Sequence, residues 1–255
     1  MLTDLLPAPS LGHFIPCDLS RPNDVRRLLE QTQPDQIYHL AGAFTNDYEA
    51  DYKANFLSTK SLLDFLLAAK KNTRVLLIGS AAEYGNAKNG ADPIAEHYPL
   101  LPLTIYGLTK VFQSHLMKYY FDNYGLNLVM ARPFNLFGKG ISNKLFVGKV
   151  YEQILDYRRG TISKIVVGNL DSERDYLDVQ SAVADYHVIM TKGGGGEVYN
   201  VGSGRPRKIR NLLDQILKAE GIDWSVVDEK NYSSSSVTIS FADICKLTRL
   251  KAENA

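Results

Sequence analysis

The chain has 255 residues, 45% of them hydrophobic and 22% charged, and a formal net charge of +1 at pH 7. This composition is typical of a soluble globular protein large enough for a full core and a small second lobe, and it excludes a disordered chain. A nearly balanced charge gives no field that would attract nucleic acid or an acidic membrane, so we expect neither as a partner.

Short apolar runs alternate with longer helical patterns, which is typical of a parallel sheet covered by helices on both faces. Five strands are predicted near 36–41, 74–79, 128–134, 164–168 and 197–201. Helices are predicted near 22–33, 47–71, 106–124, 144–158, 179–191, 207–220 and 240–249. We expect Ser20 to cap the first helix, a turn at 193–196 and a mobile loop at 232–236.

The cysteines and histidines indicate neither a disulfide framework nor a metal site. Cys17 and Cys245 are far apart and lack ligand spacing, so we expect buried reduced thiols in a cytoplasmic protein. The five histidines are scattered, which argues against metal ligation. No run approaches about 18 apolar residues and the start lacks a signal-peptide pattern, so we expect no membrane span.

Ser80, Tyr106 and Lys110 are the strongest candidates for chemistry. A tyrosine phenol is a poor base at neutral pH, but a nearby ammonium favours the phenolate and makes the group useful as a general acid or base. Tyr106 opens a predicted helix that ends at Gly125, so the four-residue spacing places Lys110 on the same helix face. The alternatives are a serine that only turns the chain and a solvated helix lysine.

A second pair with the same spacing, Tyr84 and Lys88, lies in a stretch rich in glycine and asparagine. Such a loop composition does not fix the geometry of two side chains. We therefore predict Tyr106 and Lys110 as the working pair and interpret Tyr84 as a loop aromatic that lines the site.

Motifs across nearly the whole chain resemble, in order, those of the extended short-chain dehydrogenase/reductase family of nucleotide-sugar epimerases, dehydratases and reductases. The matching segments are Cys17-Asp18-Leu19, His39-Leu40-Ala41-Gly42-Ala43, Asn55, Ser80-Ala81-Ala82-Glu83-Tyr84-Gly85, Tyr106 to Lys110, Arg132-Pro133-Phe134-Asn135, 168–176 and 198–204. Each motif is loose, but their shared order is specific. The resemblance implies a Rossmann-like, doubly wound α/β fold with a smaller C-terminal substrate lobe.

The resemblance also implies roles for individual residues. The catalytic residues would be Ser80, Tyr106 and Lys110. NAD or NADP would be bound by Asp18, Leu19, Leu40, Ala41, Gly42, Tyr106, Lys110 and Pro133. A nucleotide-diphosphate sugar would contact Ala82, Glu83, Asn135, Arg174 and Asn200, and Asn55 would be structural.

Several of these residues have ordinary structural alternatives. Asp18 can cap a helix instead of meeting the adenine, and Arg174 can pair with Asp171 or Asp175 instead of a diphosphate. Asn135 and Asn200 can be turn formers at strand ends.

The glycine-rich turn that opens the family's fold, G-x-x-G-x-x-G between a strand and a helix, is not found in the sequence. We expect residues 1–15 to approach the family's third strand, so the first βαβ segment would be lacking and a central strand position of the sheet empty. The dinucleotide-binding part would then be partial, spanning 1–135 with 160–200 returning to it. Residues 136–255 would form mainly the substrate lobe.

A second departure bears on the reaction. Dehydratases of the family carry a glutamate two residues after the catalytic serine or threonine, where this chain has Ala82. Glu83 follows, but adjacent positions of an extended segment point to opposite sides. We therefore favour a reductase or epimerase over a 4,6-dehydratase. A non-catalytic sugar-nucleotide-binding protein is the alternative of another class.

The partners expected from the resemblance are a nucleotide sugar and a second copy of the chain. The stretch from Phe134 to Val201 is most similar to GDP-sugar reductases and dehydratases, so the nucleotide could be GDP. Family members often pair through two helices, which predicts a homodimer formed by the 47–71 and 106–124 helices.

Overall fold

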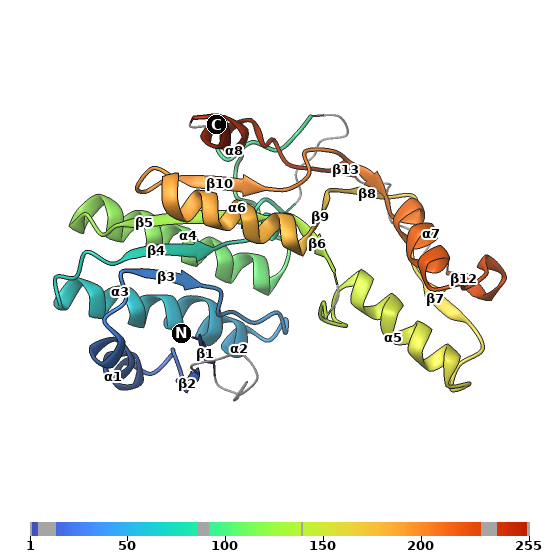
Figure 1. The fold of residues 1–255 in the computed structure, drawn as a ribbon, viewed down its shortest axis with the longest axis horizontal. Coiled ribbons are helices and arrows are strands. Elements are labelled where there is room, and N and C mark those ends of the chain that lie inside the picture. The colour runs from blue at the N-terminus through green and yellow to red at the C-terminus, as the bar shows by residue number, and fades with distance from the viewer. Residues whose placement is uncertain (1, 5–13, 86–91, 139, 231–238, 254–255) are drawn as a thin grey trace.

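The computed structural model describes residues 2–4, 14–85, 92–138, 140–230 and 239–253 (Figure 1). At its centre is a parallel sheet in the order β10 (Val198–Val201), β5 (Leu128–Pro133), β4 (Arg74–Ile78) and β3 (Gln36–His39). The inner strands β4 and β5 consist almost entirely of buried residues. A strand with both faces buried reads as a continuous apolar run, which is why these two were predictable.

Helices cover both faces of this sheet, as predicted. On one face, Val75 and Leu77 pack against α1 (Pro22–Thr32), α3 (Ser58–Ala68) and α4 (Ile105–Tyr124). On the other, Leu76 packs against α6 (Val179–Lys192) and α8 (Cys245–Ala252). Because side chains alternate along a strand, neighbouring residues of β4 enter different cores. The doubly wound α/β class is therefore confirmed.

The first two strands form a sheet of their own. β1 (Leu2–Asp4) pairs in parallel with β2 (Phe14–Pro16), and neither is hydrogen-bonded to β3 within the described part of the chain. We expected only an approach to one strand here, so the pair corrects that reading.

The helix predicted over 47–71 is continuous but changes its hydrogen-bonding pattern midway. It consists of α2 (Tyr48–Tyr52), the π-helical turn η2 (Lys53–Leu57) and α3, and the Asp47 side chain accepts a bond from the Ala50 N–H at its start. Two other boundary predictions were wrong. Arg21, not Ser20, is the N-cap residue of α1, and α8 begins only at Cys245.

A second lobe lies to one side of the sheet (Figure 1). Its core is formed by α5 (Phe146–Arg158), α7 (Ile209–Ala219), the 3₁₀ turn η4 (Trp224–Val226), β7 (Ile165–Val167) and β12 (Val227–Glu229). β7 pairs with β12 and so belongs to this lobe, not to the segment predicted to return to the sheet. The return is made by α6, β10 and α8, whose residues line the sheet's second core.

Very short strands connect the two parts. β6 (Asn135–Phe137) pairs with β9 (Tyr176–Asp178), and β8 (Glu173–Arg174) lies between β11 (Arg207–Lys208) and β13 (Ile239–Ser240). Runs of two or three residues carry too little periodicity to be predicted.

The other structural expectations have mixed outcomes. Cys17 is buried as expected, whereas Cys245 is exposed at the start of α8. Residues 193–196 turn the chain before β10, and the loop predicted at 232–236 lies outside the described residues. Among the helices that are described, none has the length and apolar character needed to cross a membrane. The described residues contain no group of three or more histidine, cysteine or acidic side chains suited to a metal ion.

Candidate active site

Ser80 follows the carboxyl end of β4 and starts a tight turn, the 3₁₀ helix η3 (Ala81–Glu83). Its hydroxyl accepts a bond from the Ala82 N–H at 3.1 Å, and its own N–H donates to Glu83 Oε1 at 2.8 Å. This reciprocal arrangement is a capping box. It holds Ser80 at the edge of the sheet where ligands bind in open α/β folds.

Tyr106 lies in the first turn of α4, next to the Ser80 turn. Thr104 caps this helix by accepting a bond from the Gly107 N–H at 3.0 Å. Gly107 packs so closely that a Cβ at this position would lie 2.5 Å from the Ala82 carbonyl oxygen. A side chain here would push the two segments apart, so this glycine brings the helix start against the turn.

Ser80, Tyr106 and Lys110 are brought together as predicted. The Ser80 side chain is hydrogen-bonded to Tyr106, and this bond favours the phenolate. Lys110 Nζ lies 5.9 Å from the centre of the Tyr106 ring. Lys110 is only 4% exposed, so the alternative of a solvated helix lysine was wrong.

The electrostatic prediction for Tyr106 was wrong in sign. Burial raises the pKa of Tyr106, and the Ser80 hydrogen bond opposes this only in part, while Glu83 and Asp51 raise the pKa further. The Lys110 ammonium donates to the Ile78 carbonyl at 2.8 Å and to Gln113 Oε1 at 3.1 Å. Burial lowers the pKa of Lys110 itself to about 8. The phenol therefore holds its proton at neutral pH.

The loop after β3 lines the same region and is fixed by Asn55. The Asn55 side chain accepts from the Ala43 N–H and donates to the Ala43 carbonyl, both at 2.9 Å. It also donates to Thr109 Oγ1 at 2.9 Å, which ties the loop to α4. A Cβ on Gly42 would lie 2.7 Å from Asn55 Oδ1 and 3.4 Å from Lys110 Nζ. The structural role predicted for Asn55 is confirmed.

The predicted dinucleotide contacts lie on three strand ends. Leu40 and Gly42 are exposed, Ala41 is partly buried beside them, and Pro133 closes β5 with partial exposure. Leu19 packs against the core formed by α1, α3 and α4. Contact of these residues with a cofactor stays a prediction.

Asp18 makes local contacts of its own. Its Oδ1 accepts from the Ser20 N–H at 3.0 Å, and its Oδ2 lies 3.2 Å from Arg21 Nε and 3.6 Å from Lys53 Nζ. The Ser20 bonds lower its pKa. Since α1 has no side-chain cap, the alternative of Asp18 as a helix cap was wrong.

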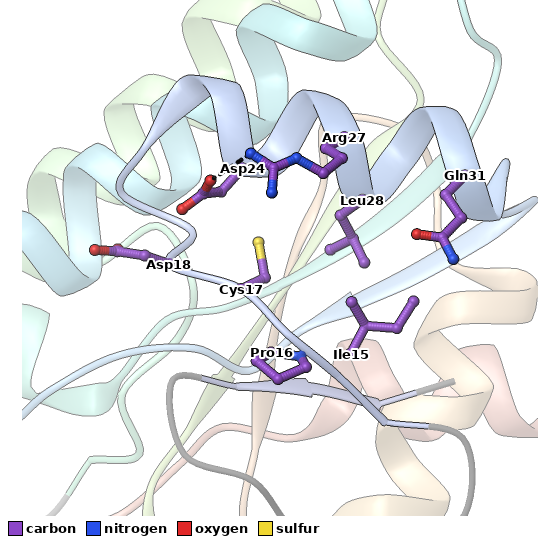
Figure 2. Close-up of a pocket in the computed structure, with 8 residues that line it drawn as sticks. All are labelled: Ile15, Pro16, Cys17, Asp18, Asp24, Arg27, Leu28 and Gln31. Carbon is purple, nitrogen blue, oxygen red and sulfur yellow. Dashed lines mark hydrogen bonds and ion pairs between the residues drawn. The ribbon is translucent and has the colours of Figure 1, made fainter.

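A cavity of about 270 Å³ opens between β2 and α1, lined by residues that include Cys17, Asp18 and Arg27 (Figure 2). Neither Ser80 nor Tyr106 lines it. The cavity is therefore separate from the chemistry described above.

Two of the predicted substrate contacts are corrected by the structure. Glu83 is fully buried and forms an ion pair with Arg132, whose Nη2 lies 2.8 Å from Glu83 Oε2. Asn200 is also fully buried: it accepts from the Tyr84 hydroxyl at 2.7 Å and donates to the Ile94 carbonyl at 2.7 Å. Both side chains have no exposed surface and are hydrogen-bonded within the protein. Tyr84 belongs to this buried network as well, so the expectation that it lines the site was wrong.

Asn135 and Arg174 lie in one neighbourhood, because β6 pairs with β9 and places Asn135 opposite Tyr176. Asn135 is exposed and donates to the Asp175 carbonyl at 3.0 Å. Arg174 donates to the Glu173 carbonyl at 2.8 Å, and burial lowers its pKa. Together with Ala82, which is partly buried in the Ser80 turn, these residues stay predicted substrate contacts.

Comparisons with known proteins bear directly on this arrangement. The profile of the NAD dependent epimerase/dehydratase family matches residues 2–202. The chain is 31% identical over 219 residues to GDP-6-deoxy-D-mannose reductase from Pseudomonas aeruginosa, covering 83% of this chain and 71% of that protein. The chain belongs to the NAD dependent epimerase/dehydratase family.

Other proteins are similar over most of the chain. A probable UDP-arabinose 4-epimerase from Arabidopsis thaliana is 26% identical and covers 89% of this chain, which spans 60% of that protein's length. The structure of RMD from Pseudomonas aeruginosa complexed with NADPH superposes with a TM-score of 0.84 at 26% identity, covering 96% of this chain and 86% of that one. UDP-glucose 4-epimerase from Thermotoga maritima shares the fold, with a TM-score of 0.83, 21% identity and coverage of 96% and 79%.

Several residues that shape the site of this family member escaped prediction. The Phe44 ring meets the Tyr106 ring edge-on with centroids 5.1 Å apart, and the buried Asp51 carboxylate holds the Phe44 loop by accepting from the Thr45 N–H at 2.8 Å. Gln113 accepts the bond from Lys110. For Glu83 a local signal existed, since Ser80-Ala81-Ala82-Glu83 has the S-x-x-E spacing of a capping box.

Proposed function

We propose that this protein is an NAD(P)-dependent reductase or epimerase of a nucleotide-diphosphate sugar. One observation carries the proposal: a serine hydroxyl, a phenol and a buried ammonium converge where β4 ends and α4 begins. A proton donor and a cation at the end of a parallel sheet suit the oxidation and reduction of an alcohol or ketone. The relatives described above include a reductase and an epimerase by name, which supports the same chemistry.

The residues fit a nicotinamide dinucleotide at this edge. Two bonds of the Lys110 ammonium are made within the protein, which leaves one of its three donors without a partner among the described residues and open to a ribose hydroxyl. Gly42 provides an exposed backbone beside this ammonium. Lys110, Gly42, Leu40 and Pro133 would hold the group. When bound, it supplies or accepts the hydride.

The side chains of the chain handle the proton. Tyr106 keeps its proton at neutral pH and would donate it to a sugar carbonyl oxygen during reduction. Ser80 would hydrogen-bond the same oxygen and steady the phenol. Lys110 would hold the ribose, and its ammonium would stabilise the negative charge that develops on Tyr106 as the proton leaves.

The substrate proposed is a GDP-hexose, held by Asn135 and Arg174. A planar guanidinium binds phosphate oxygens through two parallel hydrogen bonds, which suits a diphosphate. The first relative described above is a GDP-sugar reductase by name, which supports this choice of nucleotide.

We also propose a homodimer. Tyr48, Tyr52 and Phe56 stack in series along α2 and η2, and Phe112 of α4 packs edge-on against the last two. This gives the two predicted helices a continuous aromatic surface of the kind that pairs in oligomers.

The experiment is to mix the purified chain with NADH or NADPH and a GDP-4-keto-6-deoxyhexose and to follow nicotinamide absorbance. Consumption of reduced dinucleotide in proportion to the sugar product supports a reductase. Interconversion of two nucleotide sugars without net consumption supports an epimerase. Binding of the nucleotide sugar without binding of either dinucleotide would overturn the proposal and favour a non-catalytic binding protein.

A further inference from the structure

The Glu83 carboxylate connects the Ser80 turn to the interior of the sheet. One oxygen, Oε1, accepts the Ser80 N–H at 2.8 Å. The other, Oε2, accepts Arg132 Nη2 at 2.8 Å and the Ser114 hydroxyl of α4. The two oxygens thus bind different parts of the protein, and the side chain has no exposed surface from which to reach a ligand.

Arg132 is in turn held rigidly. Its guanidinium lies 4.7 Å from the centre of the Tyr84 ring, and its Nη1 donates to the Tyr84 hydroxyl at 2.8 Å. The Tyr84 hydroxyl donates onward to Asn200 in β10. Glu83 is therefore anchored to β5, β10 and α4 at once. Buried charged hydrogen bonds of this kind are costly to break and leave little freedom of movement.

The backbone around Ser80 is built to admit this carboxylate. A Cβ on Gly79 would lie 2.5 Å from Glu83 Oε1, closer than any side-chain carbon can approach. The Ser80 N–H is bound to Glu83 and the Ser80 hydroxyl accepts the Ala82 N–H, and the same hydroxyl is hydrogen-bonded to Tyr106.

We propose that Glu83 is a positioning residue whose buried carboxylate, anchored by Arg132 and Ser114, fixes the Ser80 hydroxyl against the Tyr106 phenol. The geometric part of this proposal stands on the ligand-free protein alone. Its catalytic consequence rests on the function proposed above. A purely structural carboxylate would affect folding but would leave the contact between Ser80 and Tyr106 unchanged.

The test is a double-mutant cycle in the ligand-free protein, in which the measured quantity is the titration of the Tyr106 phenol. The protein carries 3-fluorotyrosine at position 106, whose phenol titrates at lower pH than tyrosine, and fluorine NMR follows its titration. The Ser80 bond favours the phenolate, so Ser80→Ala is expected to shift the titration upward. The size of this shift measures the contact between the two side chains.

The same Ser80→Ala shift is then measured in two further backgrounds. Glu83→Asp keeps a negative charge for Arg132 but is one methylene too short to reach the Ser80 N–H as well, so the shift is expected to vanish. Glu96→Asp is the matched control: Glu96 Oε1 accepts the Asn200 N–H at 2.9 Å in the same network without touching Ser80, so the full shift is expected to persist. An undiminished shift in the Glu83→Asp background would overturn the proposal.

A second variant tests the proposal if the Glu83→Asp protein does not fold. Ser114→Ala removes one anchor of Glu83 and leaves its ion pair with Arg132 in place. A smaller Ser80→Ala shift in this background supports the proposal, and an equal shift contradicts it.

Turnover provides the catalytic readout. Glu83→Asp is expected to lower kcat by about 10²-fold, the cost of a displacement of about 1 Å at a reacting group, with KM unchanged. Adding Glu83→Asp to Ser80→Ala should cost nothing more, because both act through one hydroxyl. A wild-type protein without turnover would refute the proposed function and leave the NMR cycle intact as the test of Glu83.

Discussion

The buried Lys110 ammonium should make the stability of the protein depend on pH in a specific window. Burial lowers its pKa from 10.5 to about 8, so the folded protein penalises the charged form. Below about pH 8 both folded and unfolded chains carry the proton, and the penalty is present in full. Between about 8 and 10.5 the unfolded chain binds more protons, so the free energy of unfolding rises with pH.

The gap between the two pKa values corresponds to about 3 kcal/mol, at about 1.4 kcal/mol per pKa unit. Lys110→Met has no such charge. We therefore expect the free energy of unfolding of the wild type, minus that of Lys110→Met, to increase by about 3 kcal/mol as the pH is raised from 7 to 10.5. Urea unfolding of both proteins across this range measures the difference, and titrations common to both cancel.

Lys118→Met is the matched control, because Lys118 is on the same helix but pairs with Asp122 at the surface, where its ammonium stays in contact with water. Its removal should change the free energy of unfolding at pH 7 by less than about 1 kcal/mol, as expected for an exposed ion pair. A difference for Lys110→Met that does not change between pH 7 and 10.5 would refute the conclusion that its ammonium is buried with a penalty.

Three further predictions follow from the site and its support. Tyr106→Phe should lower turnover by about 10²–10⁴-fold while nucleotide-sugar affinity, measured by calorimetry, stays near the wild-type value; unchanged turnover would remove Tyr106 from the mechanism. Gly107→Ala should destabilise the protein by about 1–3 kcal/mol in urea unfolding, because the added carbon meets the Ala82 carbonyl; a gain of about 1 kcal/mol from helix propensity would show that the contact is not tight. Arg74→Met should lower the free energy of unfolding by about 1–3 kcal/mol, because Arg74 donates to Asn127 and to carbonyls at the end of α6. Arg26 is exposed, so Arg26→Met should change it little, and equal effects of the two substitutions would contradict the capping role of Arg74.

The sequence was sufficient to predict the sheet and the working pair because both depend on local patterns. β4 and β5 are apolar runs, and α4 begins at a threonine cap and ends at Gly125 in a left-handed conformation. Residues four apart on such a helix share a face, so Tyr106 and Lys110 had to lie together. The substrate lobe was predicted only in outline, because its connecting strands are two or three residues long.

The charge state of the site could not be predicted in the same way. The spacing places an ammonium near a phenol, but burial has the largest effect on the pKa of each group, and burial depends on residues far along the chain. The Lys110 ammonium, for example, lies against the Ile78 carbonyl, 32 residues away in β4. The Glu83 network is non-local for the same reason, with Ser114 and Arg132 lying 31 and 49 residues along the chain.

The position of the Glu83 carboxylate in the Ser80 turn bears on the choice between reduction or epimerisation and dehydration. We expected that Glu83 would not take the place of a glutamate at the position of Ala82, because neighbouring residues of an extended segment alternate. The segment is instead a 3₁₀ turn, so that reason was wrong, although the conclusion holds. Three residues after the cap, a glutamate folds back on the N–H of the cap residue and becomes buried. A glutamate at the position of Ala82 would lie two residues after the cap residue and would not close this box. In this chain the carboxylate of the turn belongs to Glu83 and accepts the Ser80 N–H.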